Sequence, residues 1–155
     1  MARNLQIIAL AMLPAVSSVG APPSGFSRTV LTGDYSEIIG ITPLRDARSL
    51  AFERNVVVWI ISEDGEASEE PFLDISEEVL PWRDHGFMSL VVDPEFLSNG
   101  LVYVLYVVDP HHLHLFGSPD YDPNETWESM ASIGRVTRYE ATSESAFALV
   151  DPSTR

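Results

Sequence analysis

The stretch Leu101-Val-Tyr-Val-Leu-Tyr-Val-Val108 decides the fold of this chain, because every residue in it is β-branched, aromatic or leucine. A short, continuous apolar run of this composition is typical of a β-strand that is covered on both faces. Turn signals lie on either side of the run, Asn99-Gly100 before it and Asp109-Pro110 after it. The stretch therefore predicts one buried strand with a turn at each end.

The same composition recurs along the chain on both sides of this strand. Three further runs have strand length and β composition, namely Asn55–Ser62, Phe87–Val92 and Ile133–Tyr139. Only Ile75–Val79 and the segment Glu125–Met130 could form short helical turns. We therefore predict an all-β protein, either as a small sandwich or as part of a larger stacked structure that covers the apolar strands.

The composition excludes several classes of protein. The 155 residues carry nine cations, all of them arginine, and a formal net charge of −14. Nucleic-acid affinity comes mainly from basic side chains, so we expect no nucleic-acid partner. Cysteine is absent from the sequence, which excludes disulfides, thiolate nucleophiles and cysteine-based zinc sites.

The N-terminal segment has the order of a secretory signal peptide. A basic start containing Arg3 leads into an apolar stretch from Leu5 to Val19, and small residues then accumulate up to Ala21. The stretch is shorter than the roughly 20 residues that a membrane span needs. We predict a signal peptide over residues 1–21, no membrane span after its removal, and a secreted or periplasmic location. A buried N-terminal helix is the alternative.

Three motifs in a fixed order carry a resemblance to a known family. They are Pro71-Phe-Leu-Asp-Ile-Ser76, then Gly86-Phe-Met-Ser-Leu-Val-Val-Asp-Pro-Glu-Phe96, then Asn99-Gly100 followed by Val102-Tyr-Val-Leu-Tyr106. This order resembles the glucose/sorbosone dehydrogenase family, the soluble quinoprotein sugar dehydrogenases. The resemblance covers roughly residues 40–140, nearly all of the chain after the predicted signal peptide.

The resemblance implies a six-bladed β-propeller that binds pyrroloquinoline quinone (PQQ) and calcium, oxidises a sugar substrate and passes electrons to an acceptor. Six blades of about 40 residues need well over 240 residues. We therefore expect residues 26–155 to be an incomplete domain, a partial β-propeller of about one to two four-stranded blades. The family pattern also has a turn and strand after Ser49-Leu-Ala-Phe52 that this sequence lacks, which predicts that the first blade loses a strand.

The resemblance places most of the functional residues of the family beyond Arg155. The catalytic histidine lies in an H-x-G-G turn that no histidine of this sequence matches, so we assign no catalytic or metal-binding residue and expect the chain alone to be inactive. One position carries over. The family has a polar side chain two residues before the glycine that corresponds to Gly86, facing the cleft near quinone and sugar. Asp84, with His85 beside it, is the predicted cofactor-binding position, and a solvated turn acid is the alternative.

Other candidate residues favour structural roles. His111, His112 and His114 are expected in a solvated loop, with a metal-binding pair as the alternative. Asp120–Asn124 imitates the first half of a calcium loop but lacks its glycine and closing glutamate. The tryptophans are expected to pack rather than to stack on sugars. A non-catalytic extracellular binding or interaction module is the alternative to an enzyme fragment.

Overall fold

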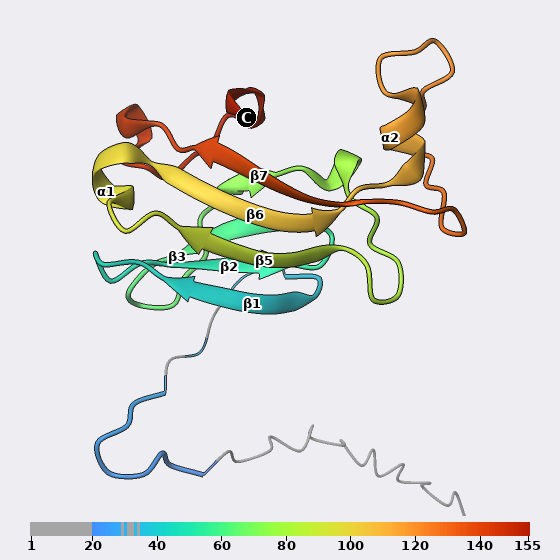
Figure 1. Cartoon of the computed structure of the whole chain (residues 1–155). Coiled ribbons are helices and arrows are strands. Elements are labelled where there is room, and N and C mark those ends of the chain that lie inside the picture. The colour runs from blue at the N-terminus through green and yellow to red at the C-terminus, as the bar shows by residue number, and fades with distance from the viewer. Residues whose placement is uncertain (1–19, 29, 31–32, 34) are drawn as a thin grey trace, which may run out of the picture.

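The computed structural model describes residues 20–28, 30, 33 and 35–155 and shows two antiparallel β-sheets stacked on one another (Figure 1). The first sheet has the order β1-β2-β3-β4, with β1 (Ile38–Pro43), β2 (Ser49–Glu53), β3 (Val57–Ile61) and β4 (Leu73–Asp74). The second has the order β5-β6-β7, with β5 (Phe87–Val92), β6 (Leu101–Val107) and β7 (Gly134–Glu140). The all-β prediction is confirmed. The predicted signal peptide lies almost wholly outside the described residues.

Short helical segments connect and follow these strands. They are η1 (Ser76–Glu78), α1 (Phe96–Asn99), α2 (Pro110–Leu115), η2 (Ser143–Ser145) and η3 (Pro152–Thr154). The helical turn expected within 75–79 is confirmed as η1, whereas the segment 125–130 contains turns and no helix. Among the described residues, no helix is long and apolar enough to cross a membrane.

The core lies between the two sheets and comes from one face of each. Leu50, Phe52 and Val58 of the first sheet belong to the same buried cluster as Phe87 and Val104 of the second. The Phe52 and Phe87 ring centroids are 5.1 Å apart, a tilted aromatic pair at the centre of this contact.

The first strands of the two sheets, β1 and β5, are neighbours. The Thr42 Oγ1 atom on β1 donates a hydrogen bond of 3.0 Å to the Leu90 carbonyl oxygen on β5. The remaining strands of each sheet follow in chain order. β1 and β5 therefore lie at the same edge of the two stacked sheets, and β4 and β7 are the last strands of their sheets.

The expectation that the first sheet lacks a strand is wrong. β2 and β3 form a continuous antiparallel pair, from Ser49 opposite Ile61 to Phe52 opposite Val58. The chain reverses between them through Val56, which has a φ of 72° and donates its N–H to the Glu53 carbonyl oxygen at 3.1 Å. The run Asn55–Ser62 takes the place next to β2, so the sheet keeps four strands despite the shorter sequence.

The loop expected after β6 is a helix. Asp109 caps α2 by accepting a hydrogen bond of 2.7 Å from the His111 N–H, and Pro110 occupies the first turn. The pair Asp109-Pro110 therefore both ends a strand and begins a helix. As a result His111 and His112 are 1% and 7% exposed rather than solvated, and only His114 faces the solvent.

Within residues 20–28, 30, 33 and 35–155, the second sheet is covered on one face only, which corrects the prediction that the strand at 101–108 is buried on both. Met88, Val91, Leu105 and Val136 on its other face are 52%, 55%, 39% and 69% exposed. An apolar sheet face of this kind is normally covered by a further layer of structure.

Candidate functional site

The predicted site is the turn of residues 82–86, which leads directly into β5. Asp84 is exposed, His85 is half-buried, and Gly86 is buried. The turn is closed by the His85 N–H, which donates to the Trp82 carbonyl oxygen at 2.9 Å. The two predicted residues therefore do lie together, at the end of the stack where β5 begins.

The side chains of this turn pack against one another. The Arg83 guanidinium carbon lies 4.4 Å from the Trp82 ring centroid, a cation–π contact. The Trp82 and His85 ring centroids are 6.0 Å apart. The buried Nδ1 atom of His85 has no hydrogen-bond partner among the described residues. Since a buried polar atom without a partner is costly, His85 is the one group of the turn that would gain by binding a ligand or water.

Gly86 is required by the way the turn meets the first sheet. Its φ is 120°, and a Cβ atom there would lie 2.7 Å from the Arg54 carbonyl oxygen. That same oxygen accepts the Phe87 N–H at 3.0 Å, so it cannot move away without losing the bond. The Arg54 side chain makes two further hydrogen bonds of 2.9 Å, donating to the Arg83 carbonyl oxygen and to the Glu37 carboxylate. The turn is thus held rigidly by the β2–β3 reversal.

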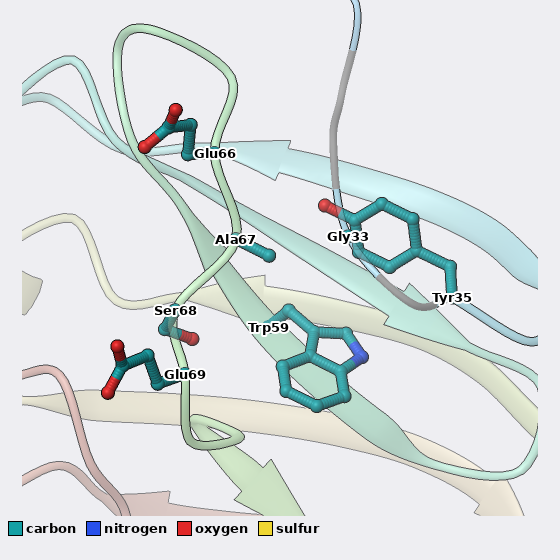
Figure 2. Close-up of a pocket in the computed structure, with 7 residues that line it drawn as sticks. All are labelled: Gly33, Tyr35, Trp59, Glu66, Ala67, Ser68 and Glu69. Carbon is teal, nitrogen blue, oxygen red and sulfur yellow. The ribbon is translucent and has the colours of Figure 1, made fainter.

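A second feature is the hollow of about 400 Å³ on the outer face of the first sheet (Figure 2). Trp59 and Tyr35 present aromatic surface there, and the Trp59 Nε1–H donates to Glu53 Oε1 at 3.0 Å. Figure 2 shows the Glu66 and Glu69 carboxylates pointing away from the two rings. The hollow therefore offers apolar surface without convergent polar groups, which suits packing better than catalysis.

The strongest polar cluster surrounds Glu78, which the sequence analysis did not single out. The Glu78 residue is 5% exposed, and its carboxylate accepts from the Tyr106 hydroxyl at 2.7 Å and from the guanidinium groups of Arg135 and Arg155. Burial alone would raise the pKa of Glu78, but these hydrogen bonds and positive charges lower the pKa below its usual value. Glu78 is therefore an ionised, paired carboxylate that joins η1 to the second sheet.

Metal binding finds no support in the described part of the chain, where no group of three or more histidine, aspartate or glutamate side chains could hold an ion. Within residues 120–124, the Asp122 carboxylate accepts from the backbone and side-chain N–H groups of Asn124 at 2.9 and 3.1 Å. This is an aspartate-initiated turn.

Comparison with known proteins places the fold. The chain matches no protein-family model. Among solved structures it is similar to the PQQ-bound form of an aldose sugar dehydrogenase from Streptomyces coelicolor, with a TM-score of 0.52 and 18% sequence identity. The likeness covers 76% of this chain and 28% of that one. At this level of sequence identity, the likeness shows a similar fold. The prediction of a partial β-propeller is confirmed, and the chain spans little more than a quarter of the structure it matches.

The residues around the turn do not by themselves fit PQQ. The quinone carries several carboxylates, which require multiple cationic partners. Of the residues that the structure describes, only Arg54 and Arg83 bring positive charge to this turn. Arg54 is already paired with Glu37, and the exposed Asp84 carboxylate would repel an anion. A complete cofactor site would need cations from outside the turn.

Proposed function

We propose that this chain forms two adjacent blades of a PQQ-dependent sugar dehydrogenase-like β-propeller. The observation that carries the proposal is the fold likeness to the aldose sugar dehydrogenase over 76% of the chain. In this proposal residues 1–21 direct export and residues 26–155 form the blades. The sugar, the quinone and the electron acceptor would be bound mainly by parts of a whole propeller that correspond to the other 72% of that structure.

The position of the turn supports a role for Asp84 and His85. Propeller blades are arranged around a central channel, and the innermost strands of neighbouring blades line it. β1 and β5 are the adjacent strands here, joined through Thr42 and Leu90. A turn that leads into β5 would therefore lie at the rim of the channel. We infer that Asp84 and His85 contribute polar groups to the rim of the quinone and sugar cleft, without serving as the catalytic base.

Two measurements test this function. First, the 155-residue chain, supplied with PQQ, calcium and glucose, is expected to give no dye reduction, because the turn of residues 82–86 lacks the cationic partners that the quinone carboxylates require. Clear turnover would overturn the fragment interpretation. Second, the chain can be spliced into the Streptomyces enzyme in place of the segment that it matches. Circular dichroism would establish folding, and dye reduction with an aldose would report activity.

The chimera also tests the two site residues. Asp84→Ala is expected to raise the KM for the aldose several-fold, because the Asp84 carboxylate would accept a hydrogen bond from a sugar hydroxyl, whereas Asp64→Ala, in an exposed turn between β3 and β4, should leave KM unchanged. The proposal fails if a folded chimera binds no PQQ. The assignment of Asp84 fails separately if the two variants behave alike in an active chimera.

A further inference from the structure

A second cavity lies beside α2, away from the turn of residues 82–86. It has a volume of about 580 Å³, large enough for a small organic ligand. It lies between the β4–η1 segment, α2, β7 and the C-terminal residues. Its wall includes Asp74, Glu77, His112, Phe116 and Arg155. None of them belongs to the turn, so this cavity is a separate site.

A hydrogen-bonded chain determines which nitrogen of His112 carries the proton. The Tyr121 hydroxyl donates its only proton to Glu77 Oε1, at 2.8 Å. The same hydroxyl oxygen lies 3.1 Å from His112 Nδ1, where it can therefore act only as an acceptor. Nδ1 must be the protonated nitrogen, and Nε2 carries the lone pair. Glu77, Tyr121 and His112 thus form a relay that prepares Nε2 as a hydrogen-bond acceptor.

The surroundings of His112 keep it neutral and fixed. The residue is 7% exposed, and its ring stacks on Phe116 with centroids 4.4 Å apart. Burial lowers the pKa of His112, although Glu78 and Glu77 on η1 act in the opposite direction, and Arg155 and Arg135 add to the lowering. No hydrogen bond to Nε2 is present within the described part of the chain. A buried neutral imidazole with a free acceptor at a cavity wall is therefore available to a ligand.

The charges of the wall exclude anions and favour a donor-rich ligand. Both nearby arginines pair with Glu78, and with Asp74 and Glu77 included three carboxylates face two arginines, so the wall is negative on balance. These acceptors do not converge on one point, because no group of three such side chains among the described residues could hold a metal ion. Acceptors spread along a wall suit a molecule that carries several hydroxyl groups, and Phe116 offers a surface for its C–H face.

We propose that the cavity between η1 and α2 binds a small polyhydroxylated molecule whose hydroxyl group donates to His112 Nε2. Glu77 acts through Tyr121 as a positioning residue that holds the imidazole in the required tautomer. The site goes beyond the function proposed above, since it needs neither PQQ nor the remainder of a propeller.

Long-range ¹H–¹⁵N correlation spectra of the full chain, labelled at histidine nitrogen, test the proposal directly. Without ligand, His112 is expected to show a protonated Nδ1 and an unprotonated Nε2. Glycerol and myo-inositol serve as probes, because neither is an aldose. Each should move the Nε2 signal of His112 saturably and leave the exposed His114 unchanged. The proposal is overturned if His112 is protonated at Nε2, or if neither probe moves its signal at about 0.1 M, a concentration well above any specific millimolar Kd.

A variant that breaks the hydrogen-bonded chain provides a second test of the proposal. Tyr121→Phe removes the hydroxyl and keeps the ring that stacks on His111 at 5.1 Å. The Nδ1–H tautomer should then lose its partner, and the affinity for myo-inositol should fall about fivefold, as expected for one lost hydrogen bond. An unchanged tautomer and affinity in a folded Tyr121→Phe protein would refute the relay. A signal change at His85 instead of His112 would place binding at the turn of residues 82–86.

Discussion

Replacing Glu78 by glutamine tests the polar cluster that joins η1 to the second sheet. Glutamine keeps the shape of the side chain and an oxygen that can accept the Tyr106 hydroxyl, which now donates at 2.7 Å. It removes the negative charge that faces Arg135 and Arg155. Removing one partner of a fully buried ion pair costs about 3–5 kcal/mol. Here the two arginine side chains are 31% and 38% exposed and can regain water, so we expect a loss of about 2 kcal/mol.

Urea denaturation followed by tryptophan fluorescence measures this loss. With an m-value of about 2 kcal/mol/M, the midpoint should fall by about 1 M at pH 6. The pKa of Glu78 is lowered on folding, so its stabilisation is complete above the reference value of 4.5 and is lost as the pH falls through the folded pKa. The difference between wild type and Glu78→Gln should therefore shrink steadily as the pH is lowered below 4.5.

The matched control is Glu128→Gln, which neutralises an exposed carboxylate and should leave the midpoint unchanged. A midpoint shift for Glu78→Gln no larger than that of the control would refute the argument that Glu78 is a buried, paired charge. A shift that is the same at pH 3 and pH 6 would refute its electrostatic origin and leave only a packing effect.

Three further outcomes follow from the same structure. Gly86→Ala should lower the free energy of unfolding in urea by at least about 2 kcal/mol, because its Cβ would meet the Arg54 carbonyl oxygen. The control Gly117→Ala has a φ of 81° and open space around it, so it should cost only about 1 kcal/mol. Val136→Lys should reduce self-association in light scattering and leave stability within about 0.5 kcal/mol, because Val136 is 69% exposed on the uncovered sheet face. Because burial lowers the pKa of His112, stability should fall as the pH drops below 6.5, and His112→Gln should flatten that slope; an unaltered slope would show that another group titrates.

The strands could be predicted because their signals are local. Leu101–Val107 is bounded by Gly100 and Asp109-Pro110, and its composition leaves little choice of secondary structure. The turn before β5 could also be located, because the motif that begins at Gly86 resembles a family motif, and Gly86 has a φ of 120° that L side chains rarely adopt. The helix α2 was missed because Asp109-Pro110 signals the end of a strand and the beginning of a helix with the same two residues.

The side-chain clusters could not be predicted in the same way. Glu78 has no local feature that separates it from Glu77, yet Glu78 is buried among two arginines from distant parts of the chain and Glu77 bonds to Tyr121. The three histidines of α2 are equally alike in sequence, and only packing against Tyr121 and Phe116 makes His112 a buried acceptor. The pairing of Glu78 arises from residues far apart in sequence, and the burial of His112 arises from the way α2 and the segment after it fold against one another.

The amino-acid sequence alone determined the β class, the positions of the strands, the absence of cysteine chemistry and the excess of negative charge, because each of these depends on composition or on neighbours along the chain. Only the tertiary structure decided that the first sheet keeps four strands, that the rest of the described chain leaves one face of the second sheet exposed, and that Glu78 and His112 are buried. Burial and pairing depend on which surfaces meet when the sheets stack, and that free energy is shared among many distant contacts.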